Sequence, residues 1–282
     1  MTEQVPGLRR DASSNESGGI RAPRPPLRAL EGMWLPLEAS GYWAIRPLLR
    51  LAGAGDQHPV LILPGFGADD SWTAPLRWTL RGQGYWVHPW RLGRNIGPTA
   101  HAVQGVRHRI SALHRENGTT VTLIGQSLGG VFARLFAREQ PAAIRQVITL
   151  GSPYRMVEGD RSSVPPQVWK RLQHLHDGGL GLSDRREEDR PALMVPATSI
   201  YSRTDGVAPW QACIDTVRET GENIEVRGSH IGMAINPAVV LAVLDRLGQP
   251  EGDWRPFAPP AGLRAWYPRP VSWHDRRRLA VA

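Results

Sequence analysis

One serine of the chain stands in a pattern that can make it a nucleophile. Gly125-Gln126-Ser127-Leu128-Gly129 places a glycine two positions before and two positions after Ser127, directly after an apolar run. A tight strand-to-helix turn exposes its serine hydroxyl at the edge of a sheet, and small neighbours let the surrounding backbone pass. The following helix would point its positive N-terminal end at the site, where an oxyanion is stabilised. The pattern therefore favours a nucleophile over a glycine-rich turn with an incidental serine.

Such a serine needs a base, and His230 has the position expected for one. It lies in a loop between the last predicted strand and the last predicted helix. Histidine titrates near neutral pH, so it can take the serine proton and later return it to a leaving group. Five other histidines lie on one predicted helix or in a predicted insertion and fit less well, either as the base or as metal ligands: His101, His108, His114, His174 and His176.

The acid that would orient the base is assigned to Asp205. It follows a predicted strand, so it would stand at the carboxyl edge of a parallel sheet. There it would hold one tautomer of the imidazole and stabilise the imidazolium ion. Because Gly206 follows it, and Asp-Gly is a common turn pair, a plain turn aspartate is the alternative. Asp215, on the helical segment that follows, is the reserve candidate.

These residues must be positioned by a scaffold, and apolar runs alternate with amphipathic stretches from residue 59 onward. Strands of a parallel sheet that is covered on both faces are short continuous apolar runs, as observed here. The alternation predicts an α/β fold with a mainly parallel sheet and helices on both faces. The expected strands are 59–63, 85–90, 120–124, 147–150, 194–201 and 224–226, and the expected helices are 71–81 (capped by Ser71), 98–116, 128–139 and 237–247.

The chain divides into a core and less regular segments. We expect a flexible tail over residues 1–28, a helical segment over 29–57, a core over 58–248 with an insertion at 155–192, and a Pro-, Trp- and Arg-rich arm over 249–282. The segment Leu35–Leu51 carries Arg46 and Arg50 and is interrupted by Pro47. A helix packed on the core is the favoured interpretation, and an amphipathic helix at a membrane surface is the alternative.

Composition narrows the class of protein. The formal net charge is +8, and 33 of the 34 basic residues are arginine, spread along the chain. Nucleic-acid-binding proteins concentrate such charge on one face, so this class is disfavoured. No run of 18 apolar residues and no apolar signal-peptide core occur, and Cys213 is the single cysteine. A cytoplasmic protein without disulfides is expected.

Over about residues 58–247 these segments resemble the α/β-hydrolase family, in particular small bacterial lipases and their relatives. The resemblance implies the chain order Ser127, Asp205, His230. It also implies an oxyanion hole built from the backbone N–H of Leu128 and an N–H of the loop after the first strand, Leu63-Pro64-Gly65-Phe66-Gly67. Many relatives carry His-Gly where this chain has Pro64-Gly65. Proline has no N–H, so the second donor is assigned to Phe66 or one of its neighbours.

The expected activity is hydrolysis of a small-molecule or lipid-like carboxylic ester through an acyl-enzyme, with no cofactor and no metal. Gly65, Trp72, Leu92 and Trp210 are candidates for the substrate pocket, and the insertion at 155–192 is a candidate lid. An acyltransferase that uses the same three residues is the alternative enzyme. A binding protein or a peripheral membrane protein on the same scaffold is the alternative outside enzymes.

Overall fold

The computed structural model describes residues 20–49, 55–157, 160–176, 185–216 and 218–271. Six strands form one sheet in the order β2-β1-β3-β4-β5-β6, and all neighbouring strands in it are parallel. The strands are β1 (Pro59–Leu63), β2 (Trp86–Pro89), β3 (Val121–Gln126), β4 (Ile144–Leu150), β5 (Ala197–Ser202) and β6 (Gly221–Val226).

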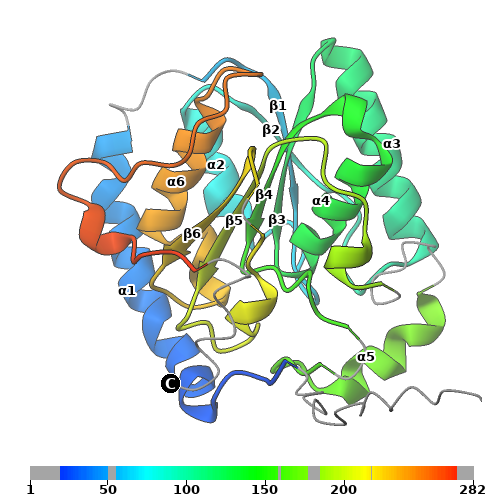
Figure 1. The fold of residues 1–282 in the computed structure, drawn as a ribbon, viewed down its shortest axis with the longest axis vertical. Coiled ribbons are helices and arrows are strands. Elements are labelled where there is room, and N and C mark those ends of the chain that lie inside the picture. The colour runs from blue at the N-terminus through cyan, green and yellow to red at the C-terminus, as the bar shows by residue number, and fades with distance from the viewer. Residues whose placement is uncertain (1–19, 50–54, 158–159, 177–184, 217, 272–282) are drawn as a thin grey trace, which may run out of the picture.

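Helices cover both faces of this sheet (Figure 1). One face carries α1 (Pro25–Leu49), α2 (Ala74–Gly82) and α6 (Pro237–Leu247), and the other carries α3 (Ala100–Asn117) and α4 (Leu128–Glu139). A short helix, α5 (Pro166–Leu172), belongs to the insertion. Two separate hydrophobic clusters lie on the two sides of the sheet. The layered α/β arrangement and the parallel sheet predicted from the sequence are therefore confirmed.

The helix ends follow local chemistry. The Thr99 hydroxyl accepts a hydrogen bond from the first turn of α3, and Gly118 ends that helix in the left-handed conformation. Asn236 caps α6 in the same way. The predicted cap Ser71 is wrong, because α2 begins at Ala74 and the Ser71 hydroxyl hydrogen-bonds to a carboxylate in the preceding turn instead.

The N-terminal boundary predicted from the sequence is also wrong. Helix α1 begins at Pro25, within the expected tail, because proline is well suited to the first turn of a helix. It runs on through Pro36 and Pro47 to Leu49. The Ile20 amide donates to the Asp160 carboxylate at 2.6 Å and the Arg161 amide donates to the Ile20 carbonyl at 2.9 Å, so residue 20 lies against the insertion. Residues 1–19 of the expected tail lie outside the described residues.

The predicted C-terminal arm packs on the core over the part that is described. The Tyr267 hydroxyl donates to the carbonyl of Ala238 on α6, and the Val271 amide donates to the hydroxyl of Tyr201 on β5. Tyr267 is buried, with its ring against Phe257. The segment up to residue 271 is thus an extended arm held in place, and the arginine run 276–278 lies outside the described residues.

The order of the strands fixes where a site can form. From β1 the chain first moves to β2 on one side and then, through α3, to β3 on the other side. The loops after β1 and β3 therefore leave in opposite directions and open a crevice at the carboxyl edge of the sheet, where ligands of open α/β sheets bind. The Pro64–Gly67 loop and Ser127 are the segments that follow these two strands.

The end of the insertion is anchored by a buried ion cluster. Arg134 on α4 donates to Glu187 of a short helix, Glu187–Asp189, and to Asp215, with N–O distances of 3.0 and 2.9 Å. All three side chains are buried. The guanidinium also stacks on the ring of Tyr154, 3.9 Å from its centroid. Burial opposes ionisation of both acids, but the neighbouring arginines hold the pKa values of Glu187 and Asp215 below the usual range.

Replacing Arg134 by methionine should therefore destabilise the fold strongly. The variant leaves two buried carboxylates without their main cation, and breaking a buried pair in this way costs about 3–5 kcal/mol. Urea unfolding followed by circular dichroism measures the loss. Arg107→Met is the matched control, because Arg107 pairs with Glu139 on the surface and such pairs contribute about 1 kcal/mol or less. Equal losses in the two variants would contradict the prediction.

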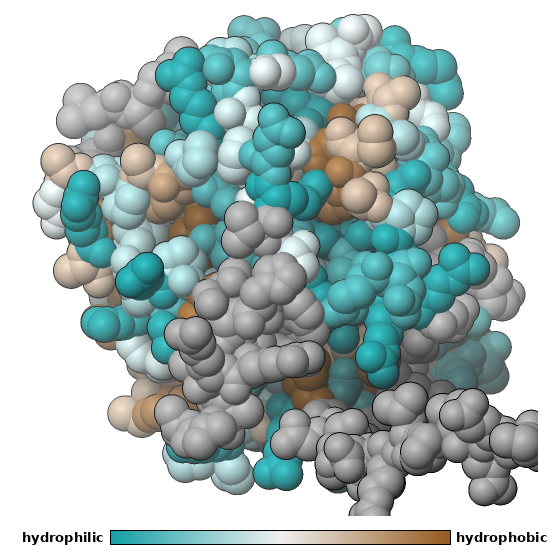
Figure 2. All heavy atoms as spheres, viewed as in Figure 1, coloured by the Kyte–Doolittle hydropathy of each residue, from teal (hydrophilic) through white to brown (hydrophobic). Residues whose placement is uncertain are grey.

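In the part of the chain that the structure describes, no helix has the length and apolar character needed to cross a bilayer. The face shown in Figure 2 is mostly hydrophilic, with separate hydrophobic patches between polar side chains.

Candidate active site

Ser127 lies at a sharp turn between β3 and α4. Its backbone angles, φ 51° and ψ −124°, are rare for a residue with a side chain and are a form of stored strain. Close packing maintains the turn: a side chain at Gly125 would strike the backbone of Gly129 and Gly130, and one at Gly129 would strike the backbone of Leu63. The two glycines of the sequence motif are thus required for the chain to pass.

Ser152 follows β4 and is the nearest rival to Ser127 in the chain. It is fully buried, and its hydroxyl donates to the carbonyls of Gly125 and Leu150, with O–O distances of 3.2 and 3.3 Å. A hydroxyl held in this way braces the turn below Ser127. The structure therefore gives Ser152 a supporting role in the packing beneath the turn.

Asp205 and His230 form a buried pair. Nδ1 of His230 donates to Oδ2 of Asp205 at 2.7 Å. The other oxygen, Oδ1, accepts the backbone N–H groups of Val207 and Ala208 at 2.8 and 2.7 Å. The carboxylate therefore has one oxygen fixed by the backbone and the other committed to the imidazole. This leaves Nε2 of His230 as the nitrogen that can accept a proton.

Three strand ends bring the serine and this pair to the same edge of the sheet. The Ser127 amide donates to the Leu150 carbonyl at 2.9 Å, and a side chain on the next residue, Gly151, would come within 3.2 Å of both Asp205 Oδ2 and His230 Nδ1. The Gln126 side chain donates to the His230 carbonyl at 3.0 Å. Gln126, which precedes the serine, thus contacts the His230 loop directly. Leu150, which binds the serine's amide, is followed by Gly151, which packs against Asp205 and His230.

The surroundings of His230 shift its pKa. Burial of the ring lowers the pKa, but the charge and hydrogen bond of Asp205, together with the charge of Glu31, outweigh burial and raise the pKa above the ordinary value. The imidazole is a stronger base than a free histidine, which suits the removal of a proton from a hydroxyl.

This shift predicts the acid limb of the pH profile. The protonated imidazole cannot accept the serine proton, so kcat/KM of an ester substrate should fall as the pH decreases through the pKa of His230. The midpoint should lie above about 6.5, the value of an unperturbed histidine. Initial rates between pH 5 and pH 9 on a nitrophenyl ester measure it. A midpoint below that of free histidine would contradict the raised pKa.

The loop after β1 is held by a buried asparagine. The Gly67 amide donates to the Asn95 carbonyl at 2.7 Å, the Asn95 amide donates to the Ala68 carbonyl at 2.8 Å, and the Asn95 side chain donates to the Pro64 carbonyl at 2.7 Å. The Ala68 amide donates to the Gly65 carbonyl. The amides of residues 67 and 68 are therefore engaged within the scaffold. The oxyanion-hole donors Phe66 and Leu128 stay predictions from the family resemblance.

Asn95→Ala should slow turnover without preventing substrate binding. The variant removes the side-chain bond that fixes the Pro64 carbonyl, while the two backbone bonds of residue 95 remain, so the loop that carries the predicted donor Phe66 would be positioned less firmly. A shift of about 1 Å at a catalytic group can cost about 100-fold, and we expect a loss of that order in kcat with KM within a factor of about three. Asn223→Ala is the control, since Asn223 makes similar side-chain bonds to Asp215 away from the loop. Unchanged kcat in folded Asn95→Ala would contradict this role.

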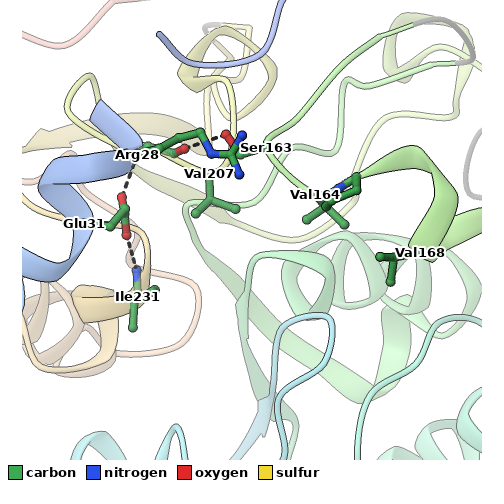
Figure 3. Close-up of a pocket in the computed structure, with 9 residues that line it drawn as sticks. Arg28, Glu31, Ser163, Val164, Val168, Val207 and Ile231 are labelled. Carbon is green, nitrogen blue, oxygen red and sulfur yellow. Dashed lines mark hydrogen bonds between the residues drawn. The ribbon is translucent and has the colours of Figure 1, made fainter. Parts of the chain in front are cut away.

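A cavity of about 400 Å³ is lined in part by Gly206 and Ile231, the residues that directly follow Asp205 and His230 in the chain (Figure 3). Its apolar side chains are Val207 and Ile231, which follow the two loops of the pair, and Val164 and Val168, which come from the insertion. Arg28 and Glu31 of α1 complete it on the opposite side. The insertion is tied to the acid loop, because the Ser163 hydroxyl donates to the Gly206 carbonyl at 2.7 Å. The cavity is mostly apolar, with polar groups at one end.

The four pocket candidates from the sequence lie elsewhere than this cavity. Gly65 lies against Ser127, whose Cβ would be 3.0 Å from a side chain at that position. Trp72 is half exposed, and Leu92 packs on the hydrophobic cluster beneath α3 and α4. Trp210 stacks on Tyr201. Of these, Gly65 is the one that lies beside Ser127, and the other three stay predictions without a shared cavity among the described residues.

Asp215, the reserve candidate for the acid, and the single cysteine, Cys213, are buried in the core. Asp215 binds Arg134 in the buried ion cluster described above. Burial raises the pKa of the Cys213 thiol well above its usual range, and a thiol of this kind is a poor nucleophile. Among the described residues, no three His, Cys, Asp or Glu side chains are grouped closely enough to hold a metal ion.

No family model and no curated protein matches the sequence. Solved structures do match. Lipase B of Aspergillus fumigatus is 18% identical, with a TM-score of 0.51, over 71% of this chain and 57% of its own. A metagenome-derived protein described under "LipS and LipT, two metagenome-derived lipolytic enzymes" is 16% identical, with a TM-score of 0.51, over 69% of this chain and 95% of its own. The protein has the α/β-hydrolase fold.

In this α/β-hydrolase fold, two residues near the site were missed by reasoning from the sequence. Asn95 lies in the loop after β2, in which the sequence predicts a role for Leu92 alone, as a pocket candidate. Glu31 lies on α1, before the part that resembles the family. Two features of the sequence could have pointed to these residues. Asn95 lies between two glycines in a loop, and Glu31 interrupts the apolar stripe of an amphipathic helix. Neither signal states which distant backbone groups the side chain would bind.

Proposed function

We propose that the protein hydrolyses carboxylic esters with Ser127 as nucleophile. The observation that carries this proposal is the strained serine turn at the end of β3 beside the hydrogen-bonded pair of Asp205 and His230. Strain of this kind at a serine that packing holds in place is expected where the hydroxyl must react. The chain order Ser127, Asp205, His230 is the order that serine hydrolases of the α/β-hydrolase fold use, and this supports the proposal further.

The proposed reaction has two halves. Nε2 of His230 takes the hydroxyl proton as the Ser127 oxygen adds to the ester carbonyl, and the amides of Phe66 and Leu128 stabilise the resulting oxyanion. The tetrahedral intermediate collapses, its bond to the alcohol oxygen breaks, and His230 returns the proton to that oxygen. Water then adds to the acyl-enzyme with His230 again as base, and the acid is released with the serine restored.

The cavity beside the pair is the proposed place for the acyl group. Val164, Val168, Val207 and Ile231 supply apolar surface, and apolar pockets with few polar groups are typical of small-molecule sites. Its volume of about 400 Å³ suits an acyl chain of moderate length better than a bulky polymer. We therefore propose a small or lipid-like ester as the substrate class.

A fluorophosphonate probe tests the nucleophile directly, because it reacts with an activated serine hydroxyl. Trypsin should release residues 116–134 as one peptide, in which Ser127 is the single serine, whereas Ser152 lies in the peptide 146–155. We expect the adduct on the first peptide only, and none after Ser127→Ala. Absence of labelling in the wild-type protein, or labelling of the second peptide, would contradict the proposal.

Transfer of the acyl group to an alcohol is the rival reaction, since the same acyl-enzyme can be resolved by either acceptor. Adding short alcohols to a nitrophenyl ester assay separates the two. If ester formation exceeds acid release at low alcohol concentration, the protein is an acyltransferase; acid release throughout supports hydrolysis.

We also propose peripheral contact of α1 with an anionic membrane. Met33, Leu37 and Trp43 expose 71%, 63% and 63% of their surface on the outer side of this helix. The exposed charged residues of α1 are Arg28 and Arg46, so the apolar side chains are accompanied by positive charge only. Co-sedimentation with phosphatidylglycerol-containing vesicles tests the contact. Binding should fall in the triple serine variant of the three apolar residues, and equal binding by that variant would refute it.

A further inference from the structure

Two glutamates occupy the inner stripe of α1, where apolar residues are expected. The stripe that faces the core runs from Glu31 through Glu38 to Tyr42 and Ile45, and the two acids expose only 6% and 3% of their surface. Burying a carboxylate is costly unless it is paired or hydrogen-bonded. Within the described part of the chain neither acid lies in an ion pair, so their partners must be polar groups of the core.

Backbone amides from both loops of the acid–base pair supply those partners for Glu31. Its Oε1 accepts the amide of Gly206, the residue after Asp205, at 2.7 Å, and the amide of His230 itself at 2.9 Å. Its Oε2 accepts the amide of Ile231 at 3.1 Å. One carboxylate thus joins the loop of the acid to the loop of the base, and Figure 3 shows it reaching from α1 between them.

Glu38 lies about two helical turns after Glu31 and makes a different set of hydrogen bonds. Its Oε1 accepts the Ser229 amide at 2.9 Å and the Asn236 side chain at 3.1 Å, and its Oε2 accepts the Ser229 hydroxyl at 2.5 Å. It therefore holds the base loop from behind and contacts neither His230 nor the acid loop through these bonds. The two glutamates share a helix, a face and burial, but differ in what they hold.

Helix α1 approaches the acid loop very closely. A side chain at Gly206 would strike the backbone of Leu27 and Arg28. This contact leaves no room for a side chain at residue 206, so the acid loop packs directly against the backbone of α1 beside the bonds of Glu31.

We propose that Glu31 is a positioning residue of the active site, which holds the Asp205 loop and the His230 loop in register through their backbone amides. The inference depends on the proposed hydrolase function. The carboxylate also adds negative charge near the imidazole, in the same sense as Asp205. The charged and titratable groups around the pair are Asp205 after β5, Cys213 beside it, Glu31 and Arg28 on α1, and Glu38 behind Ser229.

Glu31→Gln tests the clamp with little change of shape. The amide nitrogen of glutamine cannot accept the Ile231 N–H, and the negative charge is lost. We expect kcat to fall about 30-fold with KM nearly unchanged, because misplaced catalytic groups slow the reaction more than they weaken binding. The acid limb of kcat/KM should move to lower pH, since the imidazolium loses a neighbouring charge.

Glu38→Gln is the matched control, because it removes an equally buried carboxylate from the same face of the same helix. It should lose stability in urea unfolding but keep the acid limb of the wild-type protein. Equal kcat losses and unshifted acid limbs in both variants would mean that α1 acts only through stability, and this would overturn the proposal. Wild-type kcat and pH profile in folded Glu31→Gln would overturn it as well.

Two further measurements keep the test decisive. If Glu31→Gln does not fold, Glu31→Asp retains the charge but is too short to reach all three amides; it should lose kcat and keep the acid limb, and unchanged kcat would refute the clamp. Titration of the His230 ring by NMR in Ser127→Ala reports the effect of Glu31→Gln without turnover. Fluorophosphonate labelling of the wild-type protein shows separately whether the proposed function itself fails.

Discussion

Replacement of Ser127 by alanine should reduce kcat for a nitrophenyl ester about a million-fold and leave the fold intact. The variant removes the oxygen that attacks the carbonyl, so the acyl-enzyme cannot form, and removal of a serine nucleophile has this magnitude in hydrolases that use a histidine base. The small residual rate comes from the oxyanion hole and from binding of the ester. Steady-state kinetics at saturating substrate, with circular dichroism for folding, measure the effect.

Ser152→Ala is the natural control for this experiment. It deletes the same hydroxyl one strand away, where the oxygen is bound to two carbonyls and is fully buried. We expect a loss of about 1–3 kcal/mol in the free energy of unfolding, as for a buried hydrogen-bonded group, and activity within about tenfold of the wild type. If ester turnover survived Ser127→Ala but not Ser152→Ala, the nucleophile would be Ser152 and not Ser127.

Asp205→Asn should lower kcat about 10,000-fold. The amides of Val207 and Ala208 require an acceptor at the Oδ1 position, so the asparagine carbonyl must lie there and its NH₂ must face His230. Nδ1 of the imidazole then accepts a hydrogen bond, and the proton moves to Nε2. In this tautomer the nitrogen that should take the serine proton already carries one. Single-turnover kinetics at neutral pH measure the loss.

Asp215→Asn distinguishes the two acids that the sequence offered. Its carboxylate neutralises Arg134 in the buried ion cluster, so this variant should unfold at lower urea concentration. Once folded, it should turn over ester at a rate within a few-fold of the wild type. A loss of activity in Asp215→Asn that exceeds the loss in Asp205→Asn would assign the acid to residue 215.

The scaffold could be predicted because its signals are local. Strand β1 is a run of five apolar residues bounded by a histidine–proline step and a proline–glycine turn, and a strand buried on both faces needs nothing more. Helix α4 occupies the residues expected from the sequence, since the glycine-flanked serine marks its start. Composition predicts an insertion at 155–192, but it does not predict the anchoring through Glu187, because charge patterns do not reveal which acid is buried.

The site could be predicted in part, and the limit is distance along the chain. The sequence predicts Ser127 from its immediate neighbours and His230 from its place after the last strand, and both stay predictions. The choice between Asp205 and Asp215 depends on which of them meets Arg134, 81 residues from Asp215. Asn95 and Glu31 act through backbone amides and carbonyls, which every residue has. No pattern of side chains could therefore indicate their partners.

The bond between Glu31 and His230 joins residues that are 199 positions apart. A ribosome that adds about 5–20 residues per second needs about 10–40 s to make the chain between them. During that time α1 has been synthesised, but the backbone amides that donate hydrogen bonds to Glu31 and Glu38 have not. Catalytic competence should consequently arrive late in synthesis, because a chain that stalls before residue 230 lacks both the proposed base and α6, whose side chains complete the hydrophobic cluster beneath α1.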